Sequence, residues 1–227
     1  NNADLYEAVF TANGLKYHRS AHAFLAQDVP PPYYSALTVL SYEHDAEILS
    51  ELPHLVGRMG GALGVKDSFC QLDLGRYGFE TGFEASWIWR SARQVSLPSG
   101  WEIVRHASDL EIWEEGWKRN GSPTDRRMFP EAFLDMQGIF CLGQKSEGRF
   151  VSGCIANTSD ECIGLSNVFA ETPSQGVFSQ AADSAAFVGG NVPVVGYESG
   201  DQLKYATQAG FDTVGPLRIL VARNPKF

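Results

Sequence analysis

The stretch that decides the fold is the last fifth of the chain, Val192 to Arg223, with the sequence VPVVGYESGDQLKYATQAGFDTVGPLRILVAR. Its apolar start, residues 192–195, predicts a short strand. Residues 199–201 (Ser-Gly-Asp) then offer side-chain oxygens to the free N–H groups of a first helical turn, and Gly210 ends that helix. Apolar alternation over 217–221 predicts a final strand. The stretch therefore predicts a strand, a short helix and a second strand.

The chain upstream of this stretch, from Trp101 on, predicts a regular succession of elements. These are a strand at 101–104, a helix after Ser108, a shorter helix after Pro130, strands at 139–142, 150–156 and 162–170, and a helix at 175–188. The complete order is β-α-α-β-β-β-α-β-α-β. This order, together with the Gly210-Phe211 phrase before the last strand, resembles the GNAT acetyltransferase superfamily.

The resemblance implies an α/β fold, with a GNAT-like mixed sheet flanked by helices. In that fold the strands 162–170 and 192–195 run parallel and diverge at their carboxyl ends, because the helix 175–188 crosses between them. We expect two domains. Residues 98–227 form the GNAT-like acyltransferase domain, and residues 1–97 form a smaller α/β region.

A short stretch of the N-terminal region is similar in sequence to a stretch of the C-terminal region. Its phrase Gly78-Phe79-Glu80-Thr81-Gly82 resembles residues 210–213 (Gly-Phe-Asp-Thr), so residues 1–97 are interpreted as a degenerate GNAT half or as a chance match. Strands are predicted at 33–40, 69–74 and 83–89 and helices at 4–12 and 48–59, while residues 15–29 show no clean period. The stripe Phe83, Ala85, Trp87 and Trp89 is expected to face the core.

Composition excludes several classes of partner. The formal net charge of −9 argues against nucleic acid, whose phosphates need Lys and Arg to bind them. No apolar run approaches the roughly 18 residues that cross a bilayer, so no membrane partner is expected. The four cysteines are scattered and are expected to be reduced thiols, which favours the cytoplasm. The dispersed histidines show no ligand spacing, and no metal is expected.

The resemblance also implies where acetyl-CoA, the expected co-substrate, would bind. The backbone of the fourth strand would hold the pantetheine arm at Asn167, Val168 and Phe169. The start of the next helix would hold the pyrophosphate on backbone amides. Its residues are Gln175, Gly176, Val177 and Phe178.

This phosphate motif departs from the family pattern. Only Gly176 matches, Pro173 stands where Gln or Arg is usual, and Phe178 stands where a small residue is usual and is expected to crowd the loop. No Lys or Arg occurs from Phe150 to Leu203. Cations from elsewhere must therefore offset the phosphates. The candidates are Lys204, Arg126 and Arg127.

The catalytic candidates come from the fifth strand and the last helix. Glu198 is the expected base for the acceptor amine, and Glu171 is a second candidate. Tyr205 is the expected acid for the leaving thiolate, although the family's tyrosine position is occupied by Ala206, about 100° further around the helix.

The predicted function is an acyl-CoA-dependent N-acetyltransferase that transfers the acetyl group directly to a small amine or amino-acid-like acceptor. The alternative is a catalytically inactive GNAT-fold module that binds a ligand or partner. The sequence leaves the acceptor, the acyl chain and the oligomeric state open.

Overall fold

The structure, a computed structural model, describes residues 1–42, 45–59, 63–159 and 161–223. It contains two compact units, each built from two separate pieces of the chain. Unit 1 consists of Asn1–Asn13 and Trp87–Val214, and unit 2 of Gly14–Ser86 and Gly215–Phe227. The sequence-based domain boundary between residues 97 and 98 stays a prediction.

The elements from Trp101 to the C-terminus follow the predicted order, which is thereby confirmed, with the second helix a short 3-10 helix. They are β6 (Trp101–Ile103), α3 (Ala107–Arg119), η2 (Glu131–Asp135), β7 (Ile139–Ser146), β8 (Arg149–Thr158), β9 (Ile163–Ala170), α4 (Gln175–Val188), β10 (Val194–Glu198), α5 (Gly200–Gln208) and β11 (Asp212–Ala222).

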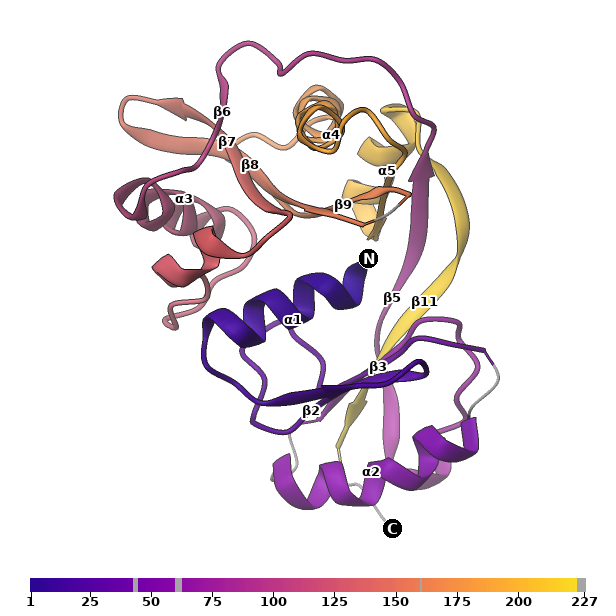
Figure 1. The fold of residues 1–227 in the computed structure, drawn as a ribbon. Helices are drawn as coiled ribbons and strands as arrows, with labels where there is room; N and C mark the ends of the chain where they lie inside the picture. Colours follow the sequence, from indigo (N-terminus) through magenta and orange to yellow (C-terminus); the bar gives the residue numbers. More distant parts are fainter. Residues whose placement is uncertain (43–44, 60–62, 160, 224–227) are drawn as a thin grey trace. The chain divides into compact units, whose positions relative to one another are not determined.

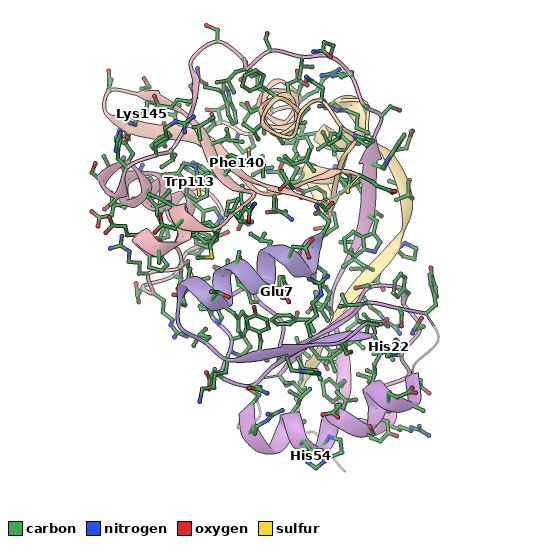
Figure 2. All side chains as sticks on the ribbon, viewed as in Figure 1. Glu7, His22, His54, Trp113, Phe140 and Lys145 are labelled. Atoms are coloured by element: carbon green, nitrogen blue, oxygen red, sulfur yellow. The ribbon has the colours of Figure 1, made fainter. Side chains whose placement is uncertain are left out.

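The sheet of unit 1 places β6, β7, β8 and β9 side by side as antiparallel neighbours, and β10 follows β9 in parallel. The end of β5 (Phe79–Arg90) lies next to β10. Helices α3 and α4 cover opposite faces of β7, β8 and β9 (Figure 1). On the α3 face, the indole of Trp113 donates a hydrogen bond to the Leu142 carbonyl at 2.8 Å (Figure 2). The α4 face is lined by small residues, and the Cys154 thiol lies 3.8 Å from the Ala181 carbonyl.

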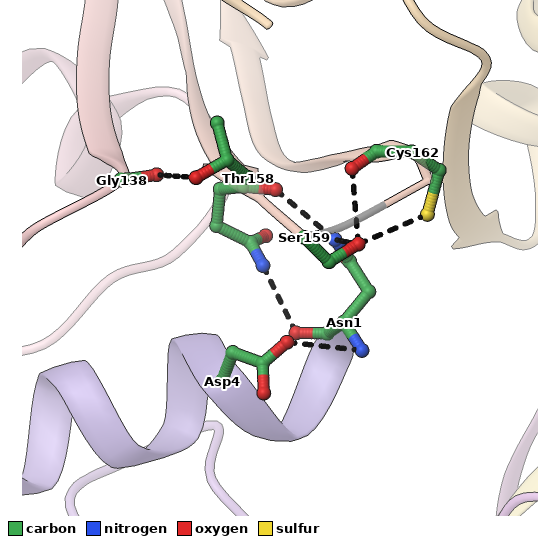
Figure 3. A network of polar contacts seen from close by, with 7 residues as sticks. Asn1, Asp4, Gly138, Thr158, Ser159 and Cys162 are labelled. Carbon is green, nitrogen blue, oxygen red and sulfur yellow. Dashed lines mark hydrogen bonds and ion pairs between the residues drawn. The ribbon is translucent and has the colours of Figure 1, made fainter.

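Helix α1 (Asn2–Ala12) belongs to unit 1, and hydrogen bonds at both of its ends join it to the rest of that unit. At its start, Asn1 and Asn157 of β8 exchange two amide–carbonyl hydrogen bonds of 3.0 and 2.9 Å, and the Asn1 amide also reaches Ser159 (Figure 3). At its end, the Asn13 amide donates to the Met128 carbonyl at 3.0 Å.

Unit 2 repeats the strand pattern of unit 1 in shorter form. β1, β2 and β3 are antiparallel neighbours, as are β7, β8 and β9, and β3 pairs in parallel with β4 across the helix α2. The short 3-10 helix η1 stands between β4 and β5, where unit 1 has α5. The bounds are β1 (Tyr17–Arg19), β2 (Ala23–Ala26), β3 (Leu37–Val39), α2 (Asp45–Met59), β4 (Gly64–Asp67) and η1 (Gly75–Tyr77).

The two Gly-Phe phrases occupy equivalent places before the long strands β5 and β11. Gly78 and Gly210 both have a positive φ, of 80° and 87°, which glycine adopts without a steric penalty. The phenylalanine after each glycine is buried, at 5% exposure for Phe79 and 3% for Phe211. This placement supports the interpretation of the N-terminal part as a degenerate GNAT half, which stays a hypothesis.

Each unit is completed by a strand from the other half of the sequence. In unit 2 the end of β11 pairs antiparallel with β4, from Arg218 opposite Asp67 to Val221 opposite Gly64. In unit 1 the end of β5 lies beside β10, where the Trp87 and Tyr197 rings meet edge to face at 5.5 Å.

The predicted strand 69–74 was wrong, because a buried carboxylate folds this segment into a loop. Asp67 accepts hydrogen bonds from the amides of Gln71 (3.1 Å) and Leu72 (3.0 Å) and from the Arg218 guanidinium (3.0 Å). The predicted strand 33–40 is shorter than expected, and β1 and β2 were not predicted.

Of the β5 residues predicted to face the core, only Ala85 is buried, at 8% exposure. Phe83 is 40% exposed, and Trp87 and Trp89 are half-buried. The opposite face also carries buried residues, since Ile88 is 2% exposed and Arg90 is 4% exposed.

Glu114 of α3 anchors the long segment that connects α3 to η2. Its buried carboxylate accepts hydrogen bonds from the amides of Met128 (2.6 Å) and Phe129 (3.2 Å) and pairs with Lys118 at 2.8 Å. Glu114→Ala leaves the buried amides of Met128 and Phe129 without a partner, so we expect it to lower the free energy of unfolding by about 3 kcal/mol.

The matched control is Glu111→Ala on the same helix, because Glu111 is 58% exposed and forms only a surface pair with Arg127. It should cost about 0–1 kcal/mol. Urea denaturation of both variants measures the difference, and equal losses would contradict the role given to Glu114.

Candidate functional site

The parallel strands β9 and β10 are paired over only two residues. Val194 lies opposite Ile163 and Val195 opposite Gly164, which confirms the predicted parallel arrangement. Both strands continue beyond this point, but within the described residues no strand pairs with the rest of this edge of β9. A Cβ added at Gly196 would lie 2.7 Å from the Leu165 carbonyl oxygen, so glycine is required where the pairing ends.

A β-bulge distorts β9 beside this free edge. The register between β8 and β9 shifts between Gly153 and Ile155, so that Asn167 and Val168 together face Cys154. Asn167 has a φ of 53°, in the left-handed region that asparagine tolerates better than most residues. The extra residue turns the backbone of β9 at the level of the opening between the strands.

The three residues predicted to hold the pantetheine arm are not equivalent. The side chains of Asn167 and Val168 are half-buried. Phe169 is 2% exposed, and its ring packs edge to face against Trp113 at 5.2 Å on the α3 face. Phe169 can therefore offer its backbone, but not its side chain, to a ligand at the β9 edge.

The N-terminus of α4 follows β9 and offers two free amides. Ser174 caps the helix, since its Oγ accepts a hydrogen bond from the Val177 amide at 3.3 Å and its carbonyl accepts one from the Phe178 amide at 3.1 Å. Of the four predicted phosphate-binding amides, those of Gln175 and Gly176 have no hydrogen-bond partner in the described part of the chain. Two of the four amides are therefore free to donate to a ligand, and the four-residue phosphate site stays a prediction.

Phe178 does not crowd this helix start, contrary to expectation. Its side chain is 1% exposed and packs edge to face against Phe211 at 5.7 Å, inside the core under α4. In front of Gly176 the space is open, since an added Cβ would meet only the Ser174 Oγ, at 3.8 Å.

Glu198, the predicted base, is the last residue of β10 and is half-buried. Burial raises the pKa of its carboxyl from an ordinary 4.5 to about 8. Among the described residues, it has no hydrogen-bond or ion-pair partner. The preceding Tyr197 has its pKa raised by burial and by the neighbouring Tyr6 and Glu198, so its phenol stays protonated at neutral pH.

Tyr205, the predicted acid, is half-buried on α5 and packs against the core beside Leu203. In the described ranges no hydrogen bond or ion pair connects it to Glu198. The structure therefore brings Glu198 to the end of β10 but gives Tyr205 no direct contact with it.

The structure adds two arginines to the cations that the sequence indicated for the phosphates. Arg127 pairs with Glu111 at 3.0 Å, and Lys204 pairs with Asp201 on its own helix. Arg119, at the end of α3, and Arg149, at the start of β8, both reach the carboxylate of Glu171.

Glu171 stands between β9 and α4, so both arginines lie beside the predicted phosphate loop. The N-O distances are 3.7 Å for Arg119 and 3.3 Å for Arg149. One signal could have located Arg149, because antiparallel pairing of the strands 150–156 and 162–170 places the start of one beside the end of the other.

The described residues contain no group of three or more His, Cys, Asp or Glu side chains arranged to hold a metal ion. None of the helices in these ranges is long and apolar enough to cross a bilayer. All four cysteines are free thiols, as expected, and Cys141 and Cys154 are buried.

Several of the solved structures that share this fold are N-acyltransferases, and all of these have a low sequence identity to this chain. No protein-family model and no curated protein matches the sequence. A GCN5-related N-acetyltransferase from Kribbella flavida aligns with a TM-score of 0.65 at 11% identity, over 98% of this chain and 94% of that one. Another, from Sphaerobacter thermophilus, aligns with a TM-score of 0.55 at 12% identity, over 97% and 88%.

The Saccharomyces cerevisiae N-myristoyltransferase with bound myristoyl-CoA aligns with a TM-score of 0.57 at 10% identity, over 96% of this chain and 73% of that one. Identities this low establish the fold alone. The likeness extends beyond the C-terminal part that the sequence indicated, and the chain therefore has the fold of the GNAT N-acetyltransferases over nearly its whole length.

Proposed function

We propose that this chain is an acyl-CoA-dependent N-acetyltransferase that transfers an acetyl group directly to a small amine or an amino-acid-like acceptor. The observation that carries the proposal is the position of Glu198. A half-buried carboxyl with a pKa of about 8 stands at the end of β10, the strand that leaves β9 after two paired residues. An acceptor amine needs such a base close to an opening between strands.

The free edge of β9 and the start of α4 fit the parts of acetyl-CoA. Backbone N–H groups along Asn167–Phe169 would donate to the pantetheine arm and to the thioester carbonyl. The amides of Gln175 and Gly176, at the positive end of the helix dipole, would donate to a phosphate oxygen. When bound, acetyl-CoA supplies a thioester whose acyl carbon accepts the amine and whose thiolate leaves.

Glu198 would take the proton that the acceptor amine loses as its nitrogen bonds to the acyl carbon. A carboxylate whose conjugate acid has a pKa of about 8 is a far stronger base than an exposed one. Tyr205 is the proposed proton donor to the leaving thiolate. Sequential transfer of this kind forms no covalent bond to the protein.

The binding-module alternative is favoured by one observation. Ala206, at the position where the family's tyrosine would stand, is fully buried and cannot donate a proton. A chain that binds acyl-CoA without transferring the acyl group would keep the β9 edge and the α4 amides but would not depend on Glu198 or Tyr205.

The pH dependence of stability tests Glu198 without any ligand. Its carboxyl titrates near pH 8 when folded and near an ordinary 4.5 when unfolded, so the folded chain holds an extra proton between these values. The free energy of unfolding therefore falls as the pH rises through that window. Glu198→Gln removes this loss, so its melting temperature relative to the parent should increase from about pH 5 to about pH 8. A difference that is constant over this range would show that Glu198 titrates normally.

Enzyme kinetics separate the two functions. We expect Glu198→Gln to lower kcat by about a hundredfold or more, with little change in the KM for acetyl-CoA, because only proton transfer is lost. Tyr205→Phe should lower kcat as well if the phenol protonates the thiolate. Thiol release with a panel of small amines and amino acids is the assay. Acetyl-CoA binding by calorimetry without any thiol release would favour the binding module.

Gly176→Ala tests the amides of α4. Its methyl group meets no atom closer than 3.8 Å, and alanine favours a helix by up to about 1 kcal/mol, so the variant should be at least as stable as the parent. The same methyl group adds bulk beside the free amides of Gln175 and Gly176 and should weaken CoA binding about tenfold.

Gly57→Ala in α2 is the matched control, because its added Cβ also meets no atom within 4 Å. Thermal denaturation and calorimetric titration with CoA measure both properties. A Gly176→Ala variant with undiminished CoA affinity would exclude phosphate binding at these amides.

A further inference from the structure

Two arginines converge on one carboxylate beside the start of α4. Arg119 and Arg149 are separated by thirty positions in sequence, and each places a terminal guanidinium nitrogen within 4 Å of the same Glu171 oxygen. The three groups together carry a formal charge of +1. The residues from Phe150 to Leu203 contain no Lys or Arg, so this positive charge beside the loop between β9 and α4 comes from outside that stretch.

This arrangement contributes little to the stability of the fold. Arg119 is 46% exposed and Arg149 is 51% exposed, and ion pairs between exposed groups contribute little. One terminal nitrogen of each guanidinium lies within 4 Å of Glu171, and a guanidinium has five N–H donors. Most of the donors of both arginines therefore remain available to a further acceptor.

A phosphomonoester is the ligand group that suits two such guanidiniums. It carries nearly two negative charges at neutral pH and three acceptor oxygens, whereas the Glu171 carboxylate carries one charge and two oxygens. It would therefore bind to the two arginines more strongly than Glu171 does. The amides of Gln175 and Gly176 form a separate donor group at the start of α4, a few residues after Glu171.

We propose that Arg119 and Arg149 bind the 3′-phosphate of CoA, while the amides at the start of α4 bind its pyrophosphate. This inference rests on the proposed function, because it takes acyl-CoA as the ligand. In this proposal Glu171 is not a catalytic base. Its carboxylate pairs with the two arginines in the absence of ligand and competes with the phosphate for them.

Calorimetric titration with CoA and with dephospho-CoA, which lacks only the 3′-phosphate, tests the proposal. We expect the parent to bind CoA about tenfold more tightly than dephospho-CoA. Arg119→Gln and Arg149→Gln should each reduce this ratio about threefold while leaving the affinity for dephospho-CoA nearly unchanged. Glu171→Gln should increase the ratio, because it removes the competing carboxylate.

Arg127→Gln is the matched control. Arg127 is 47% exposed and pairs with a glutamate, as the two arginines do, so the substitution changes the net charge equally without touching the site. The ratio of its affinity for CoA to its affinity for dephospho-CoA should equal that of the parent.

The outcomes separate this inference from the proposed function. If the parent binds neither CoA nor dephospho-CoA, the proposed function and the arginine site fail together. If CoA binds but the ratio is one, or if Arg119→Gln and Arg149→Gln weaken both ligands equally, only the arginine site is overturned. A lower CoA affinity in Glu171→Gln would also overturn it.

Discussion

The early end of the pairing between β9 and β10 is the constraint on which the site depends. Two parallel strands joined by a crossover helix ordinarily stay paired along their length, and each residue that leaves the ladder exposes backbone groups that need another partner. Here the ladder stops after Gly164 and Val195. The bulge at Asn167 and the close approach of Gly196 to Leu165 both occur next to that point. The unpaired edge of β9 is thus a consequence of this interruption, and the start of α4 and Glu198 lie at the carboxyl ends of the two strands that separate there.

Most of the GNAT-like part of the fold could be predicted from the sequence, because its signals are local. The crossover helix 175–188 requires its flanking strands to be parallel, and Gly210 marks the end of α5 by its left-handed φ. The weaker elements of the N-terminal part escaped prediction. β1 and β2 have only three and four residues, too few to show an alternation, and the segment 69–74 has strand-like composition but is folded by Asp67.

The parts of the site that escaped prediction depend on which way a side chain points and on residues far apart in sequence. The sequence pattern places Phe178 near the phosphate loop, but only the packing of α4 on Phe211 shows that its ring faces the core. In β5 the larger aromatic residues define one face, yet Ile88 and Arg90 on the other face are buried. The pKa of Glu198 likewise arises from burial, which no motif encodes.

The exchange of strands between the two halves has a consequence for the order of folding. Most of unit 2 is synthesised before most of unit 1, yet its strand β4, which pairs with β3 on one side, lacks its second neighbour until β11 is made. The Arg218–Asp67 hydrogen bond between these two strands joins residues 151 positions apart. Closing so long a loop costs conformational entropy, which is offset only when the contacts between β4 and β11 form. Contacts between residues this far apart in sequence slow folding. A nascent chain would therefore expose the edge of β4 while the second half is still being made. The N-terminal half is expected to reach its native state last, after the half that follows it in the sequence.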